Sequence, residues 1–318
     1  MLRDVNANNL ILENGAQLVN STSGVKATVK KSISTYTQNG DWYLIASPMS
    51  ENLTASNVTG LLSNDYDLYN FEQSEQLEWR NYKSQNFTIN NKIGYLYANS
   101  GNLTLSLEGT MVSNTTATTL DFDNNANFKG FNLIGNPYPC NTYIDRSFYV
   151  LDGNGSEFTL GSNPIPPCSA ILVQAQGMGE SVTFSKNASK SEPNITIAVT
   201  KANTRDNAII DQARISFNEK DQLAKFALSD RSGRLFIPKN GQDFAVAYAN
   251  GESEMPINFK AAKNGNYSIN IESENIELNY LHLIDNITGA DIDLLETPSY
   301  IFEAKTTDPI ERFRLSFE

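Results

Sequence analysis

Glu78–Lys83 is the part of the sequence whose side-chain types best suit the binding of a small polar ligand. The rings of Trp79 and Tyr82 could pack on the apolar C–H faces of a sugar, and the guanidinium of Arg80 could donate hydrogen bonds to its hydroxyl groups. We therefore predict Trp79, Arg80 and Tyr82 as ligand-binding residues. In the alternative interpretation, Leu77 and Trp79 alternate into the core of a strand and bind nothing.

A second candidate site is the run Asp152-Gly153-Asn154-Gly155-Ser156-Glu157, in which oxygen ligands occupy alternate positions. Calcium loops have this spacing, so Asp152, Asn154 and Ser156 are candidate metal ligands and calcium is the one cofactor that the sequence suggests. The later spacing and the bidentate Glu of an EF-hand are missing, and Asp-Gly-Asn-Gly is also an ordinary hairpin turn. A turn without metal therefore stays open beside the calcium site.

The chain has two cysteines, and each follows a proline-rich stretch that ends a predicted strand. Cys140 follows Pro-Tyr-Pro, and Cys168 follows Pro166-Pro167. An even number of cysteines in a chain expected outside the cell permits one disulfide, so we predict a bridge between Cys140 and Cys168. Two small buried thiols are the alternative.

His282 is the only histidine, and it lies in an apolar segment with the pattern of a strand. Asp285 follows three residues later, which places it on the opposite face of an extended strand, so the two cannot form a local acid–base pair. We expect a structural histidine, and a zinc site with several histidines is excluded. Asp291 and Asp293 share one face of the next short segment, which we expect to be the solvent-exposed side of a returning hairpin strand.

Composition and charge narrow the classes of partner. The 318 residues have a net charge of −12 and a pI near 4.7, and the basic residues are scattered singly. Nucleic acid is therefore an unexpected partner. No apolar run has the ~20 residues of a transmembrane helix, and Met1 is not followed by the apolar core of a signal peptide. Polar loops and the acidic balance suit a secreted or outer-surface protein, so we expect that the export leader and an upstream part are missing.

Apolar residues recur with period two almost throughout, which indicates strands with one buried face. In Arg312–Glu318, for example, Phe313, Leu315 and Phe317 share one face. Short strands, turn residues and the near absence of helical patterns predict an all-β fold of tandem antiparallel β-sandwich domains, of jelly-roll or immunoglobulin-like type.

An internal repeat organises the first half of the chain. Trp42-Tyr-Leu-Ile-Ala-Ser-Pro is matched 89 positions later by Phe131-Asn-Leu-Ile-Gly-Asn-Pro. Proline has no N–H for a ladder, so both copies should end a strand at this point. Three further strand signals recur in the same order, which predicts a duplicated sandwich domain. The matched signals are residues 67–71 with 147–151, 94–97 with 170–173, and 103–107 with 181–184.

Three parts follow from these patterns. Residues 1–35 contain short strands around Asn14-Gly15, which fit either a hairpin or the last coil of a parallel β-helix. Residues 36–190 form the duplicated domain, and a polar linker leads to a second sandwich domain at 191–318.

Three segments resemble the C-terminal regions of large, adhesin-like surface and secreted proteins of Bacteroidetes: residues 130–139, 280–289 and 294–315. The resemblance spans about residues 36–318. It implies an all-β, non-catalytic region of the kind that often precedes a type IX secretion sorting domain. It implies no substrate and no catalytic residue, because a frame rather than a site defines this group.

We therefore expect a non-catalytic extracellular module of a bacterial surface protein, such as an adhesin, that binds or displays a partner. A glycan and an extracellular host or matrix protein are the candidate partners. The first alternative is a carbohydrate-binding accessory region of a secreted glycan-degrading enzyme. The second is an enzyme with two carboxylates as general acid and nucleophile.

Overall fold

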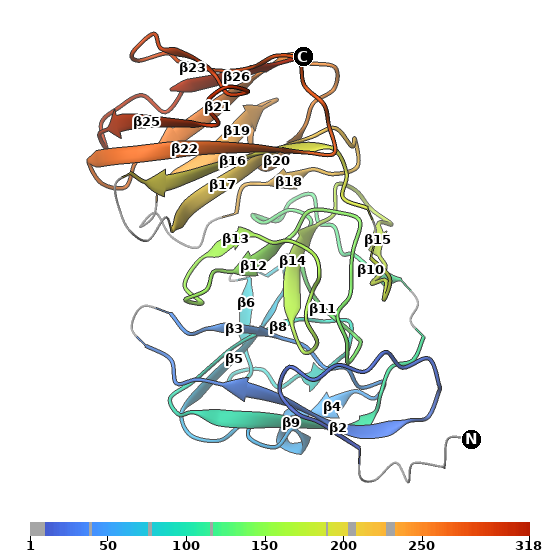
Figure 1. Cartoon of the computed structure of the whole chain (residues 1–318). Helices are drawn as coiled ribbons and strands as arrows, with labels where there is room; N and C mark the ends of the chain where they lie inside the picture. Colours follow the sequence, from blue (N-terminus) through green and yellow to red (C-terminus); the bar gives the residue numbers. More distant parts are fainter. Residues whose placement is uncertain are drawn as a thin grey trace. The chain divides into compact units, whose positions relative to one another are not determined.

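The computed structural model describes residues 10–37, 40–75, 78–114, 117–188, 190–202, 208–226 and 233–318 (Figure 1). Within these residues every regular element is a strand except for one 3₁₀ turn, Ala55–Asn57, so the all-β prediction is confirmed. No helix in the described ranges has the length and apolar character of a membrane span. The chain forms two compact units, the first comprising Met1–Glu157 and Gly161–Ser189 and the second Phe158–Leu160 and Lys190–Glu318.

The first repeat runs from β2 to β9 and folds as two layers of strands. One layer is a four-stranded sheet in the order β3-β8-β5-β6, and the other pairs β2 with β9. The buried side chains between them include Leu68 and Tyr97, neither of which is exposed to solvent. The bounds are β2 (Lys26–Ile33), β3 (Tyr43–Ile45), β4 (Leu53–Thr54), β5 (Tyr66–Phe71), β6 (Trp79–Asn81), β7 (Thr88–Ile89), β8 (Tyr95–Asn99) and β9 (Leu103–Thr110).

The second repeat runs from β10 to β15 and has the same plan. Within the first unit its sheet has the order β11-β14-β12, and β10 pairs with β15. It has a hydrophobic cluster of its own, which includes Phe148 and Ile171. The bounds are β10 (Thr118–Thr119), β11 (Phe131–Gly135), β12 (Tyr149–Leu151), β13 (Phe158–Leu160), β14 (Ala170–Gln174) and β15 (Ser181–Val182).

The two repeats share their strand order and their pairing register. Leu44 pairs with Leu96 in the first repeat, and the matched residues Leu133 and Leu172 pair in the second. Likewise Tyr69 pairs with Leu96, and Tyr149 pairs with Leu172. The short β4–β7 pair also has a counterpart, the single bridge between Thr142 and Ile165.

The proline motifs end their strands in the same way in both repeats. Ser47 Oγ accepts a hydrogen bond from Met49 N at 3.2 Å, and Asn136 Oδ1 accepts one from Tyr138 N at 3.0 Å. These side-chain turns around proline redirect the chain out of the sheet. Asn136 is fully buried, and its amide nitrogen donates to the carbonyl of Cys140 at 2.9 Å and to two further carbonyls.

Reciprocal contacts join the two repeats. Ala46 N donates to Cys168 O at 3.3 Å, and the matched pair in the opposite direction, Gly135 N to Lys92 O, has the same length. In each repeat the contact therefore involves the end of one sheet strand, β3 or β11, and the residues just before another, β8 or β14. Reciprocal use of one patch is the pattern of a two-fold interface, here between halves of one chain.

The N-terminal strands belong to this unit rather than to a separate part. β1 (Ile11–Leu12) pairs in parallel with β2, and β2 pairs with β9 along its full length. The predicted separate segment at residues 1–35 is thus incorrect from Lys26 onward, because β2 supplies half of the second layer of the first repeat. The parallel pairing of β1 with β2 is the arrangement of a β-helix coil and not of a hairpin.

The second unit is a sandwich-type fold whose strands follow one another in a continuous path around one core. The order is β24-β23-β26-β21-β19-β20-β17-β16-β22-β25, and β18 also pairs with β20. β20 links the two layers, since it pairs antiparallel with β19 through Phe244 and parallel with β17 through Ala247. That parallel pair departs from the purely antiparallel prediction. The bounds are β16 (Asn194–Lys201), β17 (Ile209–Ser216), β18 (Leu223–Ala224), β19 (Arg234–Lys239), β20 (Gln242–Tyr248), β21 (Glu254–Lys260), β22 (Gly265–Glu274), β23 (Leu281–Asp285), β24 (Asp291–Asp293), β25 (Ser299–Ala304) and β26 (Phe313–Phe317).

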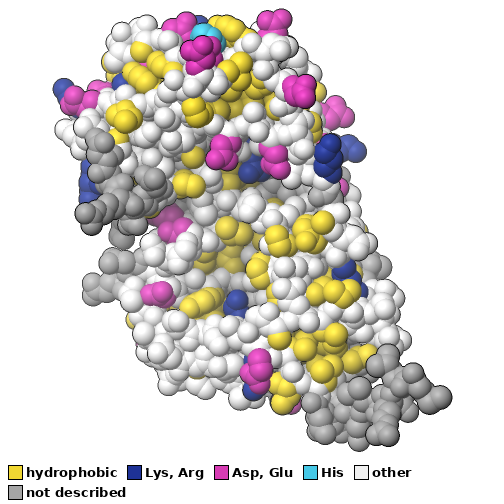
Figure 2. Space-filling model, viewed as in Figure 1, with side chains coloured by type: hydrophobic (Ala, Val, Ile, Leu, Met, Phe, Trp, Pro, Cys, Tyr) yellow, Lys and Arg dark blue, Asp and Glu magenta, His cyan; other side chains and the backbone are white. Residues whose placement is uncertain are grey.

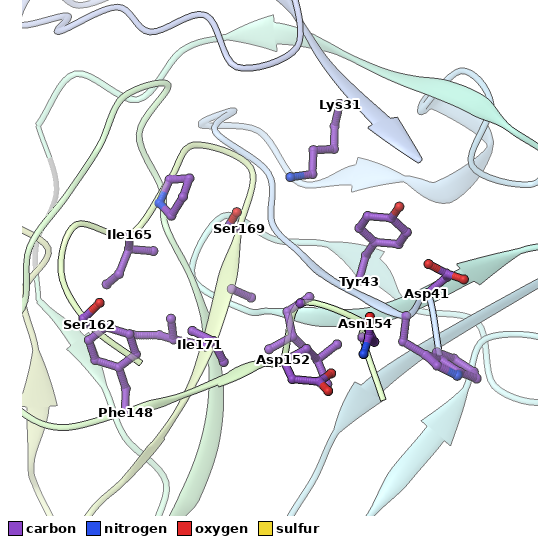
Figure 3. A pocket seen from close by; sticks show the side chains of 18 of the residues that line it. Lys31, Asp41, Tyr43, Phe148, Asp152, Asn154, Ser162, Ile165, Ser169 and Ile171 are labelled. Atoms are coloured by element: carbon purple, nitrogen blue, oxygen red, sulfur yellow. The ribbon is translucent and has the colours of Figure 1, made fainter. Parts of the chain in front are cut away.

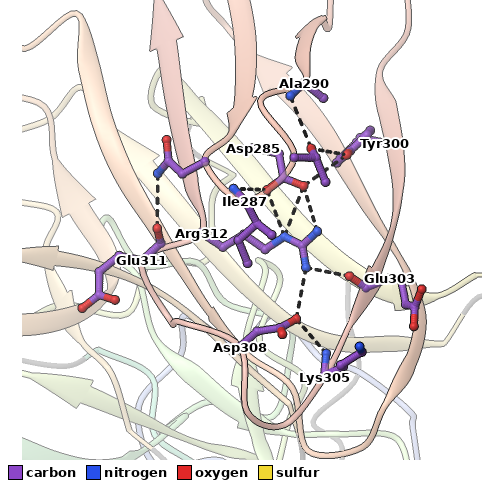
Figure 4. A network of polar contacts seen from close by, with 11 residues as sticks. Asp285, Ile287, Ala290, Tyr300, Glu303, Lys305, Asp308, Glu311 and Arg312 are labelled. Atoms are coloured by element: carbon purple, nitrogen blue, oxygen red, sulfur yellow. Dashed lines mark hydrogen bonds and ion pairs between the residues drawn. The ribbon is translucent and has the colours of Figure 1, made fainter.

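A buried ion pair joins Asp285 of β23 to Arg312, the residue before β26, in the second unit (Figure 4). Arg312 Nη2 lies 2.8 Å from Asp285 Oδ2, and Arg312 Nη1 donates to the carbonyl of Glu303 at 2.7 Å. Burial raises the pKa of Asp285, but hydrogen bonds from Arg312 and from Ile287 N outweigh that effect and hold it below its usual value. The stability from this pair is therefore present at neutral pH and is lost as the pH falls through the lowered pKa.

Candidate functional site

A cavity of about 350 Å³ opens in the first unit where the two repeats meet (Figure 3). This volume lies within the roughly 300–1,000 Å³ of small-molecule sites. The first repeat contributes Lys31 from β2 and residues 41–44 at the start of β3. The second contributes β12, the turn after it, and the approach to β14. Both halves of the duplication are needed to form this cavity.

The cavity wall combines aliphatic and aromatic side chains with separate polar groups, as ligand sites usually do. Leu44, Phe148 and Ile171 are buried parts of the wall, while Trp42 and Tyr43 are half-exposed. The Tyr43 ring is held in place because its hydroxyl accepts a hydrogen bond from Ser34 N at 2.9 Å. The polar lining consists of Lys31, Asp41, Tyr43, Asp152, Asn154, Ser162 and Ser169.

Lys31 occupies a position on β2 that the fold otherwise reserves for apolar residues. Ala27, Val29 and Ile33 point into the core at the same alternation, and each is at most 6% exposed. Lys31 pairs in register with Leu105, which is also buried. Figure 3 shows the Lys31 side chain extending from its strand toward the interior of the cavity. In the described ranges the Lys31 ammonium has neither a hydrogen bond nor an ion pair.

Backbone contacts between the repeats fix the opposite wall. Asp41 N donates to Asn154 O at 2.6 Å, and Trp42 N donates to Gly155 O at 3.3 Å. Gly155 has a φ of +61°, and a Cβ built on it would lie 2.4 Å from Trp42 O. Only glycine fits this close approach without strain. The turn after β12 is therefore adapted to contact the start of β3.

The candidate calcium ligands lie in this turn. Asp152 Oδ1 accepts from Ser156 N at 2.7 Å, and Asp152 Oδ2 lies 3.0 Å from Ser156 Oγ. Gly155 N donates to Asp152 O at 2.9 Å, which closes a β-turn between β12 and β13. In the described residues no group of three or more His, Cys, Asp or Glu side chains could hold a metal ion. Calcium binding by Asp152, Asn154 and Ser156 stays a prediction, and the geometry matches the hairpin-turn alternative.

The three predicted sugar-binding residues lie outside this cavity, in and just after β6. The Trp79 ring packs against Phe71 with ring centroids 5.1 Å apart, and the Tyr82 ring packs against Phe87 at 5.2 Å. Arg80 Nε donates to Gln85 Oε1 at 2.7 Å. All three side chains are half-exposed, so their role in ligand binding stays a prediction. Leu77, whose alternation was the competing interpretation, lies outside the described residues.

The predicted disulfide is absent, because Cys140 and Cys168 are both free and buried. Cys168 packs in the core of the first repeat and Cys140 in the core of the second, so their side chains enter different hydrophobic clusters. Burial raises the pKa of Cys168 to about 12, and it also raises that of Cys140. The structure thus has the alternative, two inert thiols.

The single histidine lies in the second unit and has partners that the sequence analysis did not assign. His282 Nδ1 lies 2.7 Å from Asp291 Oδ1, and the ring stacks on Tyr280 with centroids 4.2 Å apart. His282 also faces Asp293 across the β23–β24 pair. Asp285 pairs with Arg312 instead, as expected for a residue on the other face.

One feature of the sequence does point to the cavity. Lys31 interrupts an alternating apolar row in Lys26–Ile33, and a charge at such a position is costly unless it is paired or functional. Trp42 was used for the repeat but not as a ligand-binding residue. Comparison with protein-family models, with curated proteins and with solved structures finds no match. The geometry of the cavity is therefore the basis for assigning its role.

Proposed function

We propose that this chain is a non-catalytic binding or display module of an extracellular bacterial surface protein, and that the cavity in the first unit is its saccharide-binding site. The observation that carries the proposal is the cavity itself, which places the aromatic residues Trp42 and Tyr43 beside separate hydroxyl, amide and charged groups. Aromatic rings pack on sugar C–H faces while such polar groups bond the hydroxyls. An adhesin and an accessory region of a glycan-degrading enzyme both fit this role, since both bind sugar without cleaving it.

The composition and surface support an extracellular location. The chain is acidic, and on the face that Figure 2 shows, Lys and Arg side chains are scattered among acidic ones and form no stripe. Such a surface does not attract polyanions such as nucleic acid. The likeness of residues 130–139, 280–289 and 294–315 to Bacteroidetes surface proteins supports the same assignment.

The size of the cavity favours a small ligand or one sugar unit of a polymer over a folded partner protein. A stable protein–protein interface buries about 800 Å² on each partner, which needs a broad surface rather than a recess. A host or matrix protein could still be recognised through a glycan that it carries. Binding would then depend on the sugar and not on the polypeptide.

A glycoside hydrolase is the competing candidate, because Asp41 and Asp152 both line the cavity. Such enzymes need one carboxyl that donates a proton and one that acts as a nucleophile or base. Both oxygens of Asp152 have partners in Ser156, so this carboxylate is committed to its own turn. This favours binding over hydrolysis.

A glycan array probed with the intact chain tests the proposal, followed by affinity measurements on two variants. Trp42→Ala should weaken binding by up to about tenfold, since an aromatic stacking contact contributes on the order of 0.5–1.5 kcal/mol. Trp79→Ala is the matched control, because the chain has only these two tryptophans and Trp79 lies outside the cavity. If no saccharide binds, or if only Trp79→Ala removes binding, the cavity is not the site.

The same saccharides, incubated with the chain and analysed by chromatography, test the competing candidate. Release of shorter sugars by the wild type and its loss in Asp41→Asn would establish a hydrolase in place of a binding module.

A further inference from the structure

The geometry points to a saccharide unit that carries one carboxylate, a uronic acid, as the occupant of the cavity, with Lys31 as the residue that binds this carboxylate. This inference rests on the proposed saccharide-binding function and adds the chemical class of the ligand. Its basis is the position of Lys31 in the fold.

Lys31 is a partly buried cation in an otherwise apolar row, and no described residue pairs with its charge. The residue lies in the inward-facing row of β2, and it lines a small cavity together with Ile45 and Leu105. Long basic side chains can bury their stems if the charged end reaches a polar environment. Here the charged end reaches the 350 Å³ cavity, where no carboxylate of the described residues lies within ion-pairing distance of it.

The neighbouring lysine shows the contrast on the same strand. Lys30 points to the other face of β2, and its ammonium lies 2.8 Å from Glu13 Oε1. Lys30 therefore has an acidic partner within the chain, whereas Lys31 has none in the described ranges. An anionic group on a ligand would supply the missing partner.

The other charges of the cavity limit how much negative charge the ligand carries. Asp41 and Asp152 line the same space, and the whole chain has a net charge of −12. A dianionic phosphate or a densely sulfated sugar would be repelled by these carboxylates, and one ammonium would not compensate it. A single carboxylate on an otherwise neutral, hydroxyl-rich ring matches one cation with acceptors around it.

The remaining lining suits the rest of such a ring. Tyr43 and Trp42 offer aromatic surface on the side of β3, and Ser162, Ser169 and Asn154 offer hydroxyl and amide groups on the other repeat. These groups can bond ring hydroxyls, so the sugar would span both repeats. Lys31 would then recognise the carboxylate, and the aromatic side chains would recognise the shape of the ring.

Calorimetric titration of the intact chain with methyl galacturonate and with methyl galactoside tests the inference, since the two probes differ only in the single carboxylate. We expect the acidic sugar to bind at least about tenfold more tightly, because hydrogen bonds to charged groups are worth on the order of 1.5–3 kcal/mol. Lys31→Met should remove that preference, and Lys31→Arg should retain most of it. Lys30→Met is the matched control and should leave both affinities unchanged.

The variants separate binding from folding. Methionine at position 31 suits an inward-facing apolar row, so Lys31→Met should melt at the wild-type temperature or above. Equal affinity for the two sugars, unchanged in Lys31→Met, would overturn the inference and leave the saccharide-binding function standing. If neither these sugars nor any other on the array binds, the proposed function fails and the inference fails with it.

Discussion

The two repeats have the same strand order and register, yet they differ at the point where each sheet begins. In the second repeat Phe131 is buried, and its ring contacts Phe128 and Tyr149 with centroids 6.5 Å away in each case. The matched residue of the first repeat, Trp42, contacts Tyr69 at 6.1 Å in the equivalent way but stays half-exposed in the cavity wall. The same position is therefore buried in the second repeat and partly exposed, in the wall of a cavity, in the first.

Gln73 accounts for much of this difference. It is 4% exposed, and its amide nitrogen donates to the carbonyls of Asp121 at 2.8 Å and Phe131 at 3.2 Å. Its oxygen accepts from Gly130 N at 2.8 Å. The matched donor in the first repeat, Asp41 N, bonds instead to the backbone of Asn154. The Gln73 side chain fills the site beside Phe131, whereas only the turn after β12 borders the site beside Trp42. The loop sequences, rather than the shared strand order, therefore determine which site is open.

Truncation of the two matched aromatic residues should give the largest difference in stability between the repeats. Phe131→Ala removes a buried ring from a packed cluster and should lower the free energy of unfolding by about 3–5 kcal/mol. Trp42→Ala should cost less than about 2 kcal/mol, because that side chain is partly exposed. Urea unfolding followed by circular dichroism measures both. Equal losses would mean that the two positions are equally packed.

Glycine at the reciprocal contact between the repeats should tolerate no added methyl. A Cβ on Gly94 would lie 2.4 Å from the Cβ of Ala170 and 2.8 Å from Leu133 Cγ. Gly94→Ala should therefore destabilise the first unit by about 3 kcal/mol through overpacking. Gly177→Ala is the control, since the nearest atom to its added Cβ is 4.0 Å away, and thermal unfolding should show almost no change. A neutral Gly94→Ala would show that the repeats are not closely apposed.

Removal of Gln73 should make the second repeat resemble the first. Gln73→Ala leaves Gly130 N and Asp123 N without their side-chain acceptor, at a cost of about 2 kcal/mol in the free energy of unfolding. Loss of hydrogen-exchange protection at the Gly130 amide would show directly that this site has opened. Unchanged protection at that amide would indicate that Gln73 does not close the site.

Substitution in the turn after β12 should have the smallest effect on stability. Asp152→Asn weakens the bonds to Ser156 and should cost about 1 kcal/mol. If the segment is only a hairpin turn, calcium and a chelator should leave the melting temperature of the wild type unchanged. A calcium-dependent rise in that temperature, lost in Asp152→Asn, would instead establish the predicted metal site.

Local patterns made the repeat predictable to the residue. The alternation around Leu44 and Leu133 and the prolines after them are signals within one strand, and the matched residues do pair in the same register. The fate of Cys140 and Cys168 was not predictable in this way, because it depends on which core each strand end faces. The partners of His282 depend likewise on the register between β23 and β24.

The cavity could not be predicted from local sequence patterns, because it forms where the two repeats meet. Trp79 and Trp42 are both aromatic residues among polar neighbours in sequence, and only the contact between the repeats places Trp42 beside a recess. The sequence sign that did exist was Lys31, a charge within an apolar alternation. Its meaning becomes clear once the strand is paired with β9 and its inward face is known.

The indole N–H signals of the two tryptophans test the central claim most directly. In a ¹H–¹⁵N spectrum of the intact chain these signals can be assigned with Trp42→Phe and Trp79→Phe, and then followed during titration with methyl galacturonate and with methyl galactoside. If the cavity binds a saccharide, the Trp42 signal shifts with added sugar, more strongly for the acidic one, while the Trp79 signal stays in place. A shift of the Trp79 signal alone, or of neither signal with any saccharide that binds, would contradict the assignment of the cavity as the binding site.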